Sequence, residues 1–326
     1  MSTEFLAERV VPLELAAAVT NLAPADPFCT LSYAEARRAY GHQAWLLGIK
    51  QGGKLIAGCY GFLASGRLNS VLEIRSLPDL PWDEVFWEGL VRFCSAHRIS
   101  HLQLDTRGSP GVRIPPLPGE VKRESQCDYV LDLRNSHWEQ RVAKKHRYSI
   151  RMALQAGVTL RRSAGLDAAR DHVRLLEASM GRRRAKGESA SVPGGVKGQQ
   201  SYTFLLADKG GGGLYQAVGG GEVLSSIMIL KAAQGAFMET AGTSPEGMKC
   251  GASHFLIYSV AQTLREESIW TFNLGTGEPK SGLSLFKTRF GATPVSLEFA
   301  RFYFGSDLHR KLTNAVHSFR RIFTGR

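Results

Sequence analysis

The feature that most constrains the fold is an order of segments that occurs twice. Each copy has three short β-type segments separated by glycine turns, then an amphipathic helical pattern, then one more strand. The first copy occupies 45–50, 55–64, 69–77, 82–97 and 101–105. The second occupies 214–218, 223–231, 236–242, 253–266 and 271–274. The matched lengths and turn positions favour duplication of one α/β unit, although coincidence stays open because this order of elements is common.

The chain is long enough for two such units. It has 326 residues, of which 43% are hydrophobic, so packed cores are expected. We expect an α/β (α+β) fold with mixed, mostly antiparallel sheets flanked by helices, divided into units at 1–130 and 131–326. The second unit would also contain a basic helix at 138–156 and a glycine-rich loop at 181–200 that is mobile without a ligand.

Charge is the strongest compositional signal. The formal net charge is +12, and such a surplus attracts polyanions, whether nucleic acid, anionic lipid or phosphorylated small molecules. The surplus is also localised, which favours a site over a bulk effect on solubility. Three clusters carry it: Arg141, Lys144, Lys145, Arg147 and Arg151; Arg161 and Arg162; and Arg182 to Lys186.

Other classes of protein find little support. The five cysteines include no C-x-x-C pair, so neither a disulfide framework nor a zinc knuckle is expected. His97 and His101 are spaced i,i+4 without an evident third ligand, and we expect no metal site. The start of the chain has no apolar signal region, and no run of about 18 apolar residues occurs. These patterns predict a cytoplasmic protein.

The segment 270–294 combines a strand with a glycine loop and a short helix. The alternation around Asn273 predicts a strand that ends at Gly275 and Gly277, and 283–290 has helical spacing. Lys287 and Arg289 emerge beside this helix. Cations and exposed amides at a strand end suit an anionic ligand or a developing oxyanion, whereas the alternative is an ordinary solvated loop.

Two short segments carry a family resemblance. K-K-H-R-Y-S-I-R-M-A-L-Q-A-G-V at 144–158 and F-K-T-R-F-G-A at 286–292 resemble the signatures of Fem-type enzymes, the peptidoglycan-bridge aminoacyltransferases related to GNAT acyltransferases. Fem-type proteins consist of two GNAT units in tandem, as the internal repeat suggests here. The resemblance implies transfer of an acyl group to an amine without a covalent enzyme intermediate.

The resemblance also implies roles for individual residues. Lys287 would face the reacting carbonyl and Phe286 would position it, while Arg147 and Arg151 would hold a phosphate or carboxylate. Glu239 is a candidate general base, or else an outward residue on a solvated face. The full expected site comprises the catalytic residues Lys287, Phe286 and Glu239, and the substrate-binding residues Arg147, Arg151, Lys144, Asn273 and Arg289.

The donor is the less certain partner. Acyl-CoA enzymes of this fold usually cradle the pyrophosphate in a glycine loop led by arginine or glutamine, but here Met248 occupies the leading position. Lys249, Gly251 and Ala252 are the remaining candidates for donor binding. The departure favours aminoacyl-tRNA over acyl-CoA, with no bound cofactor and a cell-wall precursor or small natural product as acceptor. A non-catalytic nucleic-acid-binding or envelope-binding protein is the third alternative.

The last segment, 306–326, has an amphipathic helical pattern with basic residues outside its apolar face. Such a helix can lie on an anionic membrane, or it can pack on the second unit.

Overall fold

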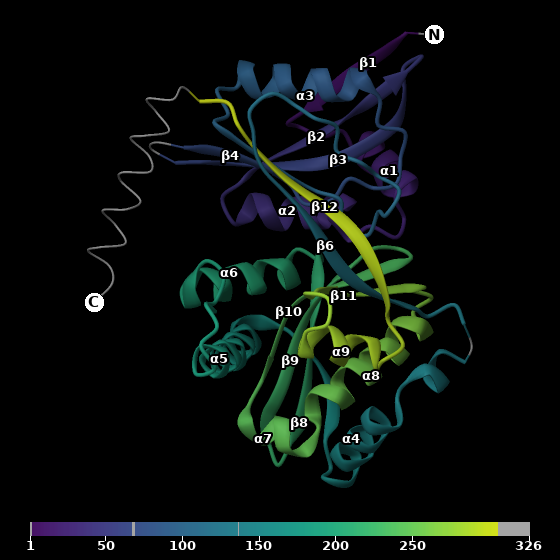
Figure 1. Ribbon diagram of the computed structural model, residues 1–326, viewed down its shortest axis with the longest axis vertical. Helices are drawn as coiled ribbons and strands as arrows, with labels where there is room; N and C mark the ends of the chain where they lie inside the picture. Colours follow the sequence, from purple (N-terminus) through teal and green to yellow (C-terminus); the bar gives the residue numbers. More distant parts are fainter. Residues whose placement is uncertain (1, 67–68, 136, 306–326) are drawn as a thin grey trace. The chain divides into compact units, whose positions relative to one another are not determined.

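The computed structural model describes residues 2–66, 69–135 and 137–305, and it has the expected α/β fold (Figure 1). The chain forms two compact units. Among the described residues, unit 1 comprises 2–22, 41–125 and 297–305, and unit 2 comprises 23–40 and 126–296. These bounds differ from the contiguous halves expected at 1–130 and 131–326, because residues 23–40 pack with the later part of the chain and the last strand pairs with the earlier part.

Unit 1 is a mixed sheet with helices on both faces. Its strands follow the order β1-β2-β3-β4-β5-β12, and β4 and β5 run parallel whereas the other pairs are antiparallel. The strands are β1 (Thr3–Glu8), β2 (Gln43–Gln51), β3 (Lys54–Ser65), β4 (Ser70–Ile74), β5 (His101–Asp105) and β12 (Thr293–Tyr303). The helices are α1 (Leu13–Leu22) and α3 (Glu84–Ala96).

Cross-strand register shows that α1 and α3 cover opposite faces of this sheet. Gly58 on β3 faces Val19 of α1 and pairs with Gly48. Phe5 on β1 packs on α3 and pairs with Ile49, the neighbour of Gly48. Successive residues of a strand point to opposite faces, so the two helices lie on different sides.

Unit 2 repeats this pattern. Its strands follow the order β7-β8-β9-β10-β11-β6, again with one parallel pair, β10 with β11. The strands are β6 (Glu120–Asp132), β7 (Thr159–Ser163), β8 (Gly212–Gly219), β9 (Glu222–Lys231), β10 (Gly235–Thr243) and β11 (Thr271–Thr276). The helices are α2 (Leu31–Ala39), α4 (Lys144–Gln155), α5 (Gly165–Arg184), α6 (Gly195–Asp208), α7 (Pro245–Cys250), α8 (Ala252–Glu266) and α9 (Gly282–Thr288), with short 3-10 helices at Pro27–Cys29 and Trp138–Arg141. Equal strand order and an equally placed parallel pair confirm the duplicated architecture.

The core of unit 2 lies between its sheet and α8. Ile227, Ile229 and Phe272 from the strands pack with Leu256 and Val260 of α8, and all five are buried. The opposite face is covered by α5, whose backbone at Leu175 and Leu176 approaches Gly242 of β10 so closely that a Cβ there would collide with it. In Figure 1, α5 and α8 accordingly lie on different sides of β9.

One local expectation differs from the structure, and one strand was not expected. The unexpected strand is β1, which residues 3–8 form at the edge of the sheet. The segment 181–200 is shorter as a loop than expected, because α5 continues to Arg184 and α6 begins at Gly195. Val192, between these helices, is buried against Val173 and Leu176. The segment 306–326 lies outside the described residues. Within them, no helix has the length and apolarity needed to cross a membrane.

Candidate active site

The candidate site of unit 2 lies where the two parallel strands stop pairing. β10 and β11 pair from Gly235 and Thr271 to Phe237 and Asn273. Immediately afterwards both strands become irregular: β10 shifts register between Met238 and Thr240, and β11 between Asn273 and Thr276. A bulge inserts an extra residue and re-aims its side chain, and here the inserted residue is Glu239. The sequence pattern of β10 alone did not reveal this bulge.

Lys287 fixes the end of β11. Its side chain is only 3% exposed, and its Nζ donates to the carbonyl oxygens of Gly275 at 2.8 Å and Thr276 at 2.9 Å. The ammonium also lies 5.7 Å from the centre of the Tyr129 ring, within range of a cation–π interaction. These contacts place the Lys287 ammonium at the end of β11, while its expected approach to a reacting carbonyl stays a prediction.

Asn273 belongs to the same buried network. Its Nδ2 donates to Asp128 at 2.8 Å, and its Oδ1 accepts from the amide of Gly275 at 2.7 Å. Asp128, which is fully buried on β6, also accepts from Thr276 Oγ1 at 2.8 Å. These bonds explain how an irregular strand end keeps its polar groups satisfied. They use one donor and one acceptor of the Asn273 amide, and substrate binding by this residue stays a prediction.

Phe286 and Phe290 dock α9 through a cluster with two histidines. Phe286 lies 5.2 Å from Phe290, between ring centres, and 5.1 Å from His146 of α4. His146 donates from Nε2 to the carbonyl of Phe286 at 2.9 Å, and its ring lies 4.5 Å from that of His254 on α8. Burial lowers the pKa of His146, and burial together with the neighbouring His146 and Lys145 lowers the pKa of His254 to about 4. Both rings are therefore neutral at pH 7, and sequence reasoning identified neither.

Glu239 lies beside a group of tyrosines. Its Oε1 accepts from Tyr202 Oη of α6 at 3.3 Å. The Tyr202 hydroxyl lies 3.4 Å from that of Tyr33 on α2, which accepts from Arg37 Nη1 at 3.1 Å. Arg37 itself is 5% exposed. Glu239 is thus half-buried and hydrogen-bonded at the bulge, which disfavours the alternative of a fully solvated face.

The basic helix α4 presents its cations to solvent. Lys144, Lys145, Arg147 and Arg151 are all exposed, and among the described residues no carboxylate lies within ion-pair distance of them. Arg147 makes one long hydrogen bond, 3.5 Å from Nη1 to the carbonyl of Gln140. Two lysines in the first turn oppose the helix dipole, and Ala143 provides no side-chain cap. Arg289, the remaining predicted cation, is half-buried at the end of α9, and its carbonyl accepts from the amide of Ala143.

The start of α8, which contains the donor-binding candidates Gly251 and Ala252, is tightly packed. The short helix α7 ends at Gly251, which has a φ of +81° and donates its amide to the carbonyl of Gly247. A Cβ at Gly251 would collide with the backbone oxygen of Ser149 on α4. Ala252 is fully buried in the core. Contact of Gly251 and Ala252 with a donor phosphate is therefore not supported, whereas Lys249 is exposed.

The sequence also matches a known family. Residues 140–287, from the beginning of the basic region to Lys287, match the acetyltransferase (GNAT) domain family. The match covers 148 of the 326 residues and includes β7 to β11 and most of α9, so this part of unit 2 is similar to a GNAT acetyltransferase domain. Among curated proteins, none matches the sequence significantly.

Solved structures resemble the whole chain in fold. FemX superposes with a TM-score of 0.65 at 12% identity, over 94% of this chain and 99% of FemX. A tandem GNAT protein from the clavulanic acid biosynthesis pathway gives a TM-score of 0.58 at 12% identity, over 94% and 100%. L-PGS from Bacillus licheniformis gives 0.53 at 12% identity, over 92% and 94%. These likenesses are in fold, and they agree with two GNAT-like units in tandem.

Proposed function

We propose that this transferase moves an aminoacyl group from aminoacyl-tRNA to an amine acceptor, a cell-wall precursor or a small natural product. The observation that favours this donor is the tight packing at the start of α8. A pyrophosphate binds to free backbone amides at a helix N-terminus. The amide of Gly251 instead donates to the carbonyl of Gly247, and Gly251 is packed against Ser149. An aminoacyl-tRNA makes no such demand at this position.

The exposed cations of α4 support the same donor. Arg147 and Arg151 are one turn apart on one face, and Lys144 and Lys145 begin the helix. Two lysines at a helix N-terminus lower stability, so their presence is better explained by an anionic ligand than by folding. A row of exposed cations that form no ion pair within the described part of the chain suits successive phosphates of a nucleic-acid backbone, whose binding weakens as salt rises.

The chemistry requires one proton acceptor. The amine nitrogen attacks the ester carbonyl, a C–N bond forms, and the C–O bond to the tRNA ribose breaks. We assign Glu239 to accept a proton from the attacking nitrogen and to return it to the ribose oxygen, which leaves as a hydroxyl. Lys287 acts indirectly: it donates to the carbonyls of Gly275 and Thr276 and so fixes the end of β11, where this strand no longer pairs with β10.

The second candidate is an acyl-CoA N-acyltransferase. It is favoured by the description of the matching family as an acetyltransferase and by the exposed Lys249 on α7, which could contact a phosphate.

The decisive experiment compares the two donors by thermal stability. A ligand that binds only the folded protein raises its melting temperature by mass action. We expect a saturable rise with charged tRNA and none with acetyl-CoA at one fixed salt concentration. Arg147→Ala/Arg151→Ala should reduce the tRNA effect and its salt dependence. The matched control is Arg170→Ala/Arg174→Ala on α5, which removes the same charge from exposed arginines that are paired with Asp167 and Asp171. A rise with acetyl-CoA alone would replace this proposal by the second candidate.

A further inference from the structure

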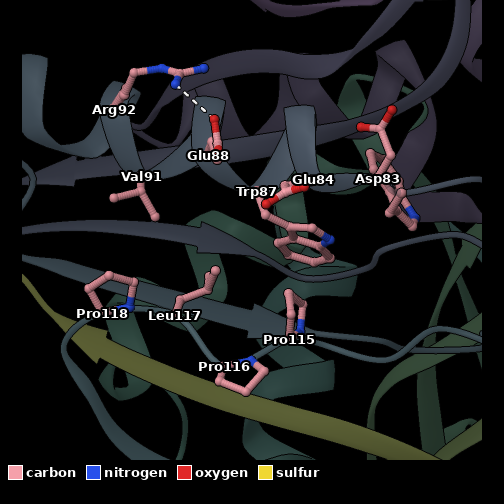
Figure 2. A pocket seen from close by; sticks show the side chains of 11 residues that line it. Asp83, Glu84, Trp87, Glu88, Val91, Arg92, Pro115, Pro116, Leu117 and Pro118 are labelled. Atoms are coloured by element: carbon pink, nitrogen blue, oxygen red, sulfur yellow. Dashed lines mark hydrogen bonds and ion pairs between the residues drawn. The ribbon is translucent and has the colours of Figure 1, made fainter.

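Unit 1 contains a pocket that the proposed reaction does not use. It has a volume of about 670 Å³ and lies between α3 and the segment 115–118 (Figure 2). Apolar side chains from both walls face each other across it: Trp87, Val91, Pro115, Pro116, Leu117 and Pro118. Trp82 also lines the pocket. An apolar pocket of this size on a surface is a candidate binding site.

The charged residues of the pocket are mostly acidic. Asp83, Glu84 and Glu88 line it together with a single cation, Arg92, which pairs with Glu88 at 3.1 Å. Its charged side chains therefore leave an excess of negative charge, although the chain as a whole carries +12. Asp83 and Glu84 also sit at the N-terminus of α3, where they would repel a phosphate. The pocket suits an apolar ligand that carries positive charge.

The described chain ends beside this pocket. The amide of Tyr303, the last residue of β12, donates to the carbonyl of Gly119 at 2.7 Å, and Gly119 directly follows Pro118 of the pocket wall. The remaining residues 306–326 include Leu308, Leu312, Val316, Phe319 and Phe323 at helical spacing. They also include five lysines and arginines and a single acidic residue, Asp307.

We propose that the segment 306–326 docks in the pocket of unit 1, with its apolar side chains against Trp87 and Leu117 and its cations toward Asp83 and Glu84. Leu308 follows Tyr303 by five residues, a reach of up to about 17 Å. A helix of this segment's length would extend for roughly 30 Å, enough to follow the whole of α3. Position, apolar spacing and charge thus agree on one occupant.

Photocrosslinking in the full-length protein tests this contact. A photoreactive phenylalanine analogue at position 117 should crosslink to peptides from 306–326, with a yield that does not change on dilution. The matched control places the analogue at position 13. Leu13 is 76% exposed, and it belongs to α1, which covers the opposite face of the sheet from α3. It should give no such product. Failure of position 117 to capture the segment, or capture that vanishes on dilution because it comes from a second copy, overturns the proposal.

Charge reversal tests the same contact without depending on one labelled residue. Glu84→Lys/Glu88→Lys should lower the crosslinking yield by about threefold to tenfold, as expected for exposed ion pairs. Adding Arg320→Glu/Arg321→Glu should restore it, because the charges are complementary again. An unchanged yield in the first variant contradicts the proposed orientation.

Discussion

At the scale of single residues, substitution of Lys287 distinguishes a structural role of this side chain from a catalytic one. Its ammonium is buried and bonded to two carbonyls at the end of β11. Lys287→Met should therefore lower the free energy of unfolding by about 2–4 kcal/mol, since hydrogen bonds from a charged group are lost and two carbonyls lose a partner. Urea unfolding measures this change.

The control for Lys287 is Lys197→Met, at an exposed position of α6, which should change stability by less than about 0.5 kcal/mol. Normal stability with lost turnover in Lys287→Met would contradict the positioning role and restore the original expectation that Lys287 contacts the reacting carbonyl.

His172 makes stability depend on pH. The ring is fully buried on α5, lies 2.9 Å from Ser226 Oγ and 2.8 Å from Thr240 Oγ1, and burial lowers its pKa to about 4. The unfolded chain binds this proton near pH 6.5, so the contribution of His172 is complete above that pH and is lost as pH falls toward 4. The shift corresponds to roughly 3 kcal/mol.

His172→Gln should be less stable than the original protein at pH 7, because the ring's packing and bonds are lost. The difference in unfolding free energy between the two proteins should then shrink by up to roughly 3 kcal/mol between pH 6.5 and 4. Denaturant unfolding across this range measures it. Parallel curves for the two proteins would show that His172 does not titrate with a lowered pKa.

At the scale of elements, the junction of α7 and α8 depends on one glycine. Gly251 has a φ of +81°, and a Cβ there would collide with the carbonyl of Ser149 on α4. Gly157 is a matched control, since its φ is +69° but a Cβ would meet nothing within 4 Å. Gly157→Ala should cost only the backbone term, about 1 kcal/mol, whereas Gly251→Ala should cost at least about 1 kcal/mol more. Equal losses in urea unfolding would contradict the close packing of α4 on this junction.

Elements with strong local patterns were predictable from the sequence. The meanders and the helices at 82–97 and 253–266 agree within a few residues with β2–β4, β8–β10, α3 and α8. β6 was missed because its exposed first half, from Glu120 to Ser125, lacks the alternation of a half-buried strand. Asp128, His146 and His254 were missed for a different reason. Their importance comes from partners on other elements, such as Asn273 and Phe286, and no local spacing encodes such pairs.

At the scale of the whole molecule, the repeat predicted two units but not which segments build them. The last strand of the unit 1 sheet is β12, whereas the equivalent strand of unit 2 is β6, from the middle of the chain. Helix α2 likewise belongs to unit 2, where it packs on α6. Hydrophobic periodicity shows that a face is buried but not which surface buries it, so exchanged segments cannot be read from the pattern alone.

The membership of residues 23–40 predicts how these residues lose protection from hydrogen exchange. Leu206→Ala in α6 removes a fully buried side chain of unit 2, and Val19→Ala in α1 does the same in unit 1. Leu206→Ala should accelerate amide exchange in 31–39 by at least about tenfold while leaving 13–22 nearly unchanged, because local opening follows the cooperative unit to which a segment belongs. Val19→Ala should have the opposite effect. If 31–39 instead follow 13–22 in both variants, α2 is stabilised by its neighbours in sequence, and its assignment to unit 2 is wrong.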